Sequence, residues 1–75
     1  MGSQVTKSSN EDKIKWLTAH PETWVKIHDT QAMIDNIAEG FVEAGLIVST
    51  RNASAVSILK LVSKTSKRMR EAARA

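Results

Sequence analysis

The chain has no cysteine and no tyrosine, and it has only one proline and three glycines among its 75 residues. Without cysteine it can form neither disulfides nor thiolate metal sites, which fits a reducing compartment. No apolar run approaches the roughly 18 residues that span a bilayer. The first nine residues lack the apolar core of a secretory signal. We therefore expect a soluble, cytoplasmic protein.

Aromatic side chains are also scarce, since Trp16, Trp24 and Phe41 are the only three. Each can bury a large area in a core that is short of bulky residues. We expect Phe41 to lie in the core. For the two tryptophans, burial in the core and exposure as an anchor for a partner stay open. A chain this short buries a modest share of its surface, so isologous pairing in a homodimer would add to its stability.

Recognisable catalytic patterns are missing. His20 and His28 are the only histidines, and no third ligand stands at zinc-like spacing from them. The sequence shows no Ser/His/Asp arrangement, no Gly-rich phosphate loop and no carboxylate dyad, and so short a chain has little room for a pocket. We predict that the protein is not an enzyme and that it holds no metal and no cofactor.

Charge is divided unevenly along the chain. Residues 1–43 carry four lysines and seven acids, a net charge of −3, whereas residues 44–75 carry seven basic groups and Glu71 alone, a net charge of +6. Such asymmetry indicates a surface that meets nucleic acid, an anionic membrane or an acidic protein. The alternative is a solvated helix face without a ligand.

The helical segments can be placed from capping signals. Residues 1–8 are predicted to be a disordered tail, and residues 9–75 a single small helical domain. Ser9 or Asn10 can cap a first helix over 11–19, which the pair His20–Pro21 ends because proline disfavours a helical residue before it.

The next segment allows two interpretations. Residues 21–44 form either one long helix or a short helix over 22–28 followed by a second over 30–44. We favour the break, because Asp29 or Thr30 can cap a new helix. Gly45 is placed as a C-terminal glycine cap. Apolar residues recur at helical spacing along this segment: Trp24, Ile27, Ile34, Ala38 and Phe41.

The last third of the chain predicts a short β-prone run followed by a long helix over 52–74. The run is Leu46 to Thr50. At the roughly 100° per residue of a helix, apolar side chains of 52–74 share one side and basic side chains the other. The apolar group is Ala55, Ile58, Leu59, Val62, Met69 and Ala73. The basic group is Lys60, Lys64, Lys67 and Arg74, with Arg68 and Arg70 on its flanks. We predict a mainly α, compact domain of three or four helices, helix-turn-helix-like, with at most a short β element at 46–50.

The stretch from Ile34 to Val48, IDNIAEGFVEAGLIV, resembles the third helix and first wing strand of winged helix-turn-helix proteins. In that family a helix ends in a small residue followed by Gly-Leu-Ile, and the chain turns directly into a strand. The resemblance covers residues 11–50, with 11–19 and 22–28 in the place of the first two helices. In size and charge the chain also resembles small phage regulators, including excisionase-like proteins.

The sequence departs from that family at the helix that would enter the DNA groove. This helix carries Asp35, Glu39 and Glu43 but no lysine or arginine. DNA binders gain affinity when their cations displace counterions from phosphates, so an acidic helix would be repelled. A helix is also predicted where the return strand of the wing should lie. We therefore expect DNA contacts to come from Arg51 and the C-terminal helix.

The leading hypothesis is a small regulator or architectural factor that binds double-stranded DNA, as a dimer. Cations at the spacing of helical turns can follow phosphates without reading bases. The predicted contacts are Arg51, Asn52, Lys60, Lys64, Lys67, Arg68, Arg70 and Arg74.

Two alternatives stay open. One is a protein-interaction module, such as a viral inhibitor or adaptor, that docks on a protein partner through its acidic helix or its basic tail. The other is a membrane-associated protein acylated on Gly2, with the polybasic helix as the required second signal.

Overall fold

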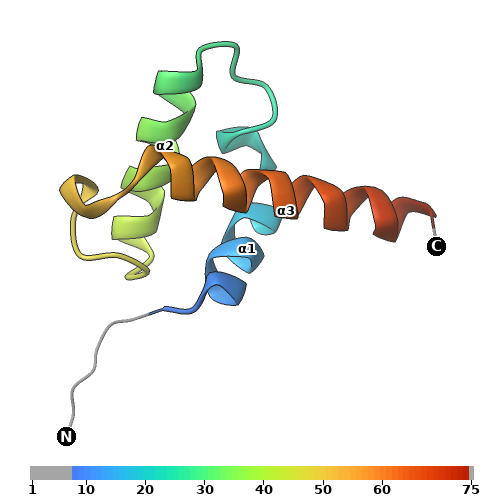
Figure 1. Cartoon of the computed structure of the whole chain (residues 1–75), viewed down its shortest axis with the longest axis horizontal. Helices are drawn as coiled ribbons and strands as arrows, with labels where there is room; N and C mark the ends of the chain where they lie inside the picture. The colour runs from blue at the N-terminus through green and yellow to red at the C-terminus, as the bar shows by residue number, and fades with distance from the viewer. Residues whose placement is uncertain (1–7, 75) are drawn as a thin grey trace, which may run out of the picture.

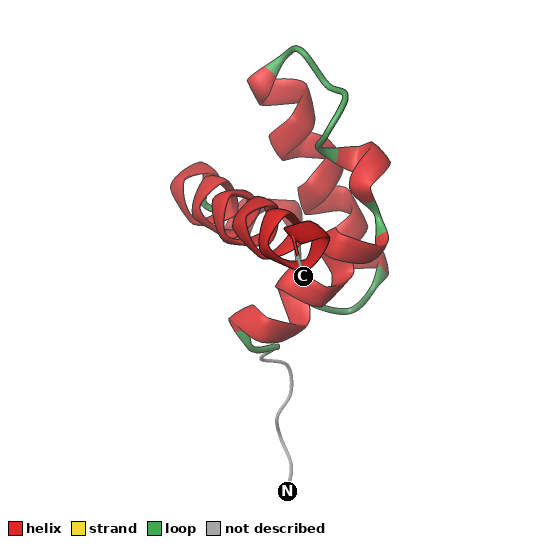
Figure 2. Cartoon of the chain, turned by 90° about the vertical axis from the view of Figure 1, so that its right-hand side faces the viewer, coloured by secondary structure: helices red, strands yellow, loops and turns green. Residues whose placement is uncertain are grey.

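Helix α3 (Ala55–Arg74) lies across α1 (Asn10–Ala19) and α2 (Thr30–Glu43) in the computed structural model, which describes residues 8–74 (Figure 1). Seen end-on, α3 lies on one side of the other two helices (Figure 2). Two short 3-10 turns, Pro21–Thr23 and Thr50–Asn52, complete the described elements. The predicted mainly α class is confirmed. The predicted acylation at Gly2 and all of the predicted tail over 1–8 except Ser8 lie outside the described range.

Helix α1 begins where its capping signals predict. The Ser9 hydroxyl accepts a hydrogen bond from the Asp12 amide at 3.2 Å, and the Asp12 carboxylate accepts one from the Ser9 amide at 3.3 Å. This reciprocal capping box satisfies two amides of the first turn. The helix ends at Ala19 before Pro21 and buries Ile14 and Leu17.

The short helix predicted over 22–28 is wrong. Only the 3-10 turn Pro21–Thr23 forms, and an irregular segment leads to α2. Trp24 turns into the core instead, where its indole N–H donates to the carbonyl of Leu17 at 2.8 Å. This buried hydrogen bond satisfies the polar edge of the ring and fixes the chain after the turn. Of the two interpretations left open for Trp24, burial in the core is confirmed.

Helix α2 confirms the predicted break and both of its ends. The Asp29 carboxylate caps it, accepting from the amides of Gln31 and Ala32. At the other end Gly45 has φ +77°, in the left-handed region that favours glycine. The Leu46 amide then donates back to the Phe41 carbonyl at 2.8 Å. Buried side chains line one side of the helix: Ile34, Ile37, Ala38 and Phe41.

The β-prone run after α2 forms no strand within the described chain. Residues 46–48 bend instead, with Leu46 and Ile47 half-buried against the core and Val48 77% exposed. The described chain offers no second strand for pairing, so these apolar side chains pack on helices. In place of the second helix and the wing of the resemblance there are thus a 3-10 turn and a bend.

Helix α3 begins at Ala55, three residues after the predicted start, because Thr50–Asn52 forms a separate 3-10 turn. Its packed side differs from the predicted one. Leu61 is buried, whereas Leu59 is 40% exposed, and Ala55 and Ala73 are exposed as well. The buried stripe is Ile58, Leu61 and Thr65, flanked by half-buried Val62 and Met69. The Thr65 hydroxyl is satisfied in this stripe by the Leu61 carbonyl at 2.7 Å.

A candidate nucleic-acid interface

Five cations lie on one exposed side of α3, which we call the basic ridge: Lys60, Lys64, Lys67, Arg70 and Arg74. All five are exposed, because the buried stripe turns the opposite side of the helix toward α1 and α2. The last turns of α3 project beyond the other helices (Figure 1), and residues 70–74 are all exposed. The ridge is therefore accessible along its whole length.

The ridge has a regular spacing. Lys60, Lys67 and Arg74 are seven residues apart, about two helical turns, so they lie nearly in line at intervals of about 10 Å along the axis. The line is about 21 Å long, which matches about six base pairs of duplex DNA. Each of these cations can therefore reach a phosphate about three base pairs from the next.

Arg68, also a predicted contact, is engaged within the molecule. Its guanidinium donates from Nη1 and Nη2 to the two carboxylate oxygens of Glu11, at 2.5 and 2.9 Å. This is the only ion pair within residues 8–74. The hydrogen bond and charge of Glu11 raise the pKa of Arg68, with a smaller contribution from Glu71. Arg68 therefore flanks the ridge without belonging to it.

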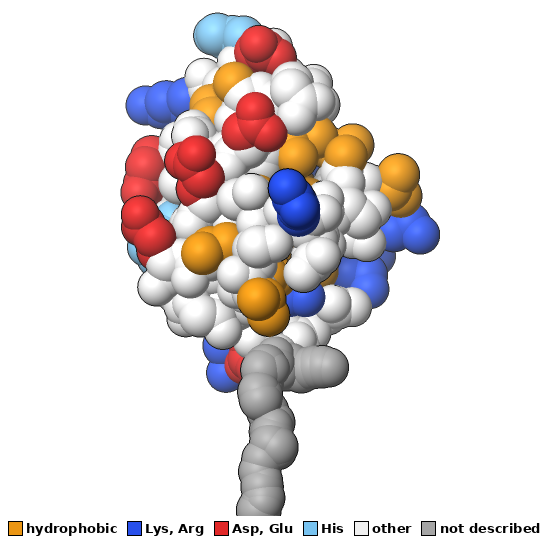
Figure 3. Space-filling model, turned by 90° about the vertical axis from the view of Figure 1, so that its left-hand side faces the viewer, with side chains coloured by type: hydrophobic (Ala, Val, Ile, Leu, Met, Phe, Trp, Pro, Cys, Tyr) orange, Lys and Arg blue, Asp and Glu red, His pale blue; other side chains and the backbone are white. Residues whose placement is uncertain are grey.

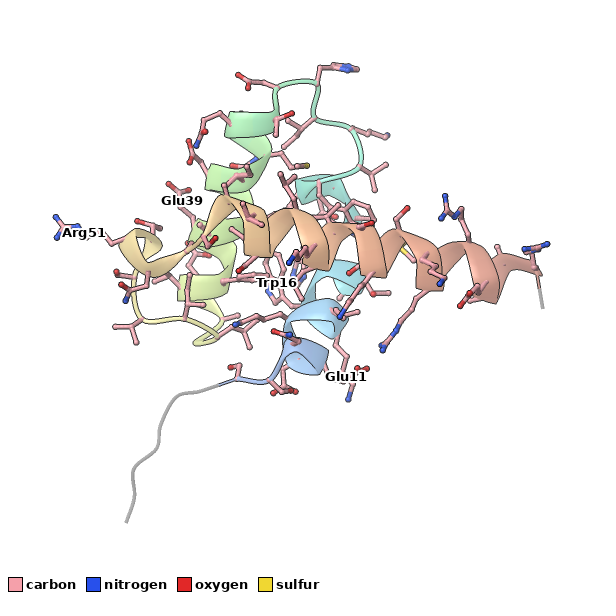
Figure 4. All side chains as sticks on the ribbon, viewed as in Figure 1. Glu11, Trp16, Glu39 and Arg51 are labelled. Atoms are coloured by element: carbon pink, nitrogen blue, oxygen red, sulfur yellow. The ribbon has the colours of Figure 1, made fainter. Side chains whose placement is uncertain are left out.

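Arg51 and Asn52 lie in the 3-10 turn before α3, apart from the ridge. Both are exposed, and Arg51 points away from the helices at the end of the molecule opposite the C-terminus (Figure 4). The structure thus gathers five of the eight predicted contacts on one surface. It sets Arg51 and Asn52 at one end and pairs Arg68 with α1.

Acidic side chains occupy a different side of the molecule. Figure 3 shows several Asp and Glu side chains gathered at the left and top of that view, while Lys and Arg side chains appear along the right edge and also at the upper left, centre and lower left. Glu39 and Glu43 of α2, with Glu22 of the 3-10 turn, border a groove of about 520 Å³ beside Trp16 and His20. No lysine or arginine lines this groove. The ridge itself holds one carboxylate, that of Glu71, which lines the same hollow as Lys67, Arg70 and Arg74.

Residue Gly40 shapes the groove through its close contact with Trp16 of α1. A Cβ at Gly40 would overlap Cη2 and Cζ2 of the Trp16 ring, so only glycine lets the indole lie on the backbone of α2. The same ring stacks on His20 with centroids 4.1 Å apart and meets the Phe41 ring edge-on at 5.3 Å. Trp16 is therefore half-buried, neither a core residue nor a free anchor.

No group of three or more His, Cys, Asp or Glu side chains within residues 8–74 could hold a metal ion. The same part of the chain contains no helix long and apolar enough to cross a membrane. Comparisons with protein-family models, with curated proteins and with solved structures found no match to this chain.

Proposed function

We propose that this protein binds double-stranded DNA through the basic ridge, as a small regulator or architectural factor. The observation that carries the proposal is the five exposed cations on one side of α3, with no carboxylate partner within residues 8–74. Phosphate neutralisation with release of counterions is the main source of affinity for such a surface.

The mode of binding follows from what surrounds the ridge. No aromatic side chain lies in α3, so the ridge has no means of stacking on unpaired bases. Lysine and arginine contacts to phosphates position a protein on DNA without sequence information. The acidic side chains of α2 disfavour its entry into a groove. We therefore propose binding to the duplex backbone with little sequence preference, supported at one end by Arg51.

Charge reversal on the ridge tests the proposal. Lys60→Glu/Lys67→Glu should lower the affinity for a fluorescent 20-base-pair duplex at least 30-fold in an anisotropy titration at low salt. The matched control is Lys13→Glu/Lys26→Glu, which changes the net charge equally but lies outside α3. The control should lower the affinity by a factor several times smaller than the factor for the ridge variant. Equal losses in both variants would show that net charge, and not the ridge, governs binding.

A protein-interaction module is the second candidate, and the acidic groove beside Trp16 favours it. Capture of one stoichiometric protein partner that is unaffected by nuclease, together with no duplex binding at low salt, would replace the DNA proposal by this one.

A further inference from the structure

The acidic groove and the basic ridge are two surfaces of the same molecule that carry opposite charge. Carboxylates of Glu22, Glu39 and Glu43 border the groove, and they form no ion pair within residues 8–74. The ridge cations likewise have no acidic partner there. Each surface therefore carries charge that the fold leaves uncompensated.

The two surfaces also match in spacing. Glu39 and Glu43 stand four residues apart on α2, and Lys60 and Lys64 stand four residues apart on α3. Side chains at this separation lie on one face of a helix, about 6 Å apart. Two helices that pack face to face could thus form both carboxylate–ammonium contacts at once.

The groove adds a site for an aliphatic, positively charged side chain. Its wall is the half-buried ring of Trp16, held against α2 by Gly40 and stacked on His20. One face of this ring is covered by His20, and the rest of the ring offers the groove apolar surface. A lysine stem can also cover apolar surface while its ammonium stays near carboxylates. An anionic partner would be repelled by the three carboxylates that border the groove.

We infer that the occupant of this groove is a second copy of the chain, whose α3 places Lys60 and Lys64 against Glu39 and Glu43 beside Trp16. Isologous pairing of two α3 helices would instead bring two basic ridges together, and like charges would oppose it. The inferred contact is head-to-tail, so a pair of copies keeps one free groove, on one copy, and one free ridge, on the other. Such contacts build open chains unless the rotation between copies closes a ring.

Exchange of charge between the two surfaces tests the inference. Sedimentation velocity of the full chain at about 20 mM salt should show a weight-average mass that rises with concentration and returns to the monomer value above about 0.3 M salt, because ionic contacts are screened. Glu39→Lys/Glu43→Lys makes both surfaces basic, and Lys60→Glu/Lys64→Glu makes both acidic. Each variant alone should stay monomeric at low salt.

The mixture of the two variants is the decisive sample, because each then meets the opposite charge on the other. An equimolar mixture should associate at least as strongly as the unmodified chain. A monomeric mixture, or association of Glu39→Lys/Glu43→Lys by itself, would overturn the inference. So would a monomeric unmodified chain at millimolar concentration and low salt.

The inference uses the same ridge as DNA binding but stands apart from it. Glu39→Lys/Glu43→Lys keeps the whole ridge, so it should lose self-association and still bind the duplex. If the unmodified chain associates but does not bind DNA, the proposed function fails and the inference stands. If the unmodified chain binds DNA but is a monomer at every concentration, the inference fails and the proposed function stands.

Discussion

The Arg68 guanidinium and the Glu11 carboxylate form two parallel hydrogen bonds that join the second half of α3 to the first turn of α1. These residues are 57 positions apart, and both side chains are about half exposed. The pair fixes α3 over α1 at the place where α3 begins to leave the core. It also divides the cations of α3 into one structural arginine and five free groups.

This pair predicts a pH-dependent contribution to stability. The hydrogen bond from Arg68 is the main cause that lowers the pKa of Glu11 in the folded state. A carboxylate with a depressed folded pKa stabilises the protein above its ordinary pKa of about 4.3, and that contribution is lost as the pH falls through the folded pKa. Denaturant unfolding should find Glu11→Gln less stable than the unmodified chain at pH 7, with the difference shrinking below about pH 4. A constant difference from pH 3 to pH 7 would contradict the assignment.

The same pair predicts unequal roles for two neighbouring cations in DNA binding. Lys64→Ala removes a free ridge cation and should reduce the slope of log affinity against log salt by about 0.9, the value for one phosphate contact. Arg68→Ala should change that slope by clearly less, because Arg68 is engaged by Glu11. The measurement is the salt dependence of duplex binding for both variants. Equal changes would place Arg68 in the ridge.

The contact between Gly40 and Trp16 predicts that replacing this helical glycine by alanine destabilises the protein, the opposite of the usual effect. Gly→Ala inside a helix usually stabilises by up to about 1 kcal/mol. Here the new methyl group would overlap the indole that packs between His20 and Phe41. Gly40→Ala should therefore lower the free energy of unfolding by about 1–2 kcal/mol, as overpacking does. Glu39→Ala, one position earlier and exposed, serves as control with a change below about 0.5 kcal/mol. A stabilised Gly40→Ala would refute the packing described.

Two leucines in α3 test which side of the helix faces the core. Leu61 is 6% exposed and Leu59 is 40% exposed. Leu61→Ala should cost about 2–4 kcal/mol by leaving a cavity, whereas Leu59→Ala should cost less than about 1 kcal/mol. The free energies come from urea unfolding followed by circular dichroism. The opposite order would restore the side predicted from the sequence.

Local signals in the sequence were enough to place α1 and α2. The capping groups of Ser9 and Asp29, the proline after His20 and the glycine at position 45 act within a few residues of the ends that they define. Each of these ends appears where it was predicted. Helical ends of this kind depend on backbone amides and carbonyls that a neighbouring side chain can satisfy.

Tertiary contacts could not be predicted in the same way. Whether Leu59 or Leu61 faces the core depends on the rotation of α3 about its own axis as it packs on α1. Two residues apart on a helix, these side chains point in directions about 200° apart. The pairing of Arg68 with Glu11 joins distant parts of the chain and leaves no local pattern. The helix predicted over 22–28 does not form, and the Trp24 indole instead donates to the buried carbonyl of Leu17. Such a contact between α1 and the following segment has no local signal in the sequence. The sequence predicts the basic residues of α3 as one set of DNA contacts. The fold is needed to separate Arg68, which pairs with Glu11, from the five cations of the ridge.

The most direct test of the account is the salt dependence of duplex binding by the unmodified chain. If about four ridge cations meet phosphates, log affinity should fall against log salt with a slope of about −3.6, a loss of about 100-fold between 50 and 200 mM salt. The same titration with a duplex of unrelated sequence should give nearly the same line. Binding that is absent at 50 mM salt, or that does not change with salt, would contradict a phosphate-binding ridge on α3.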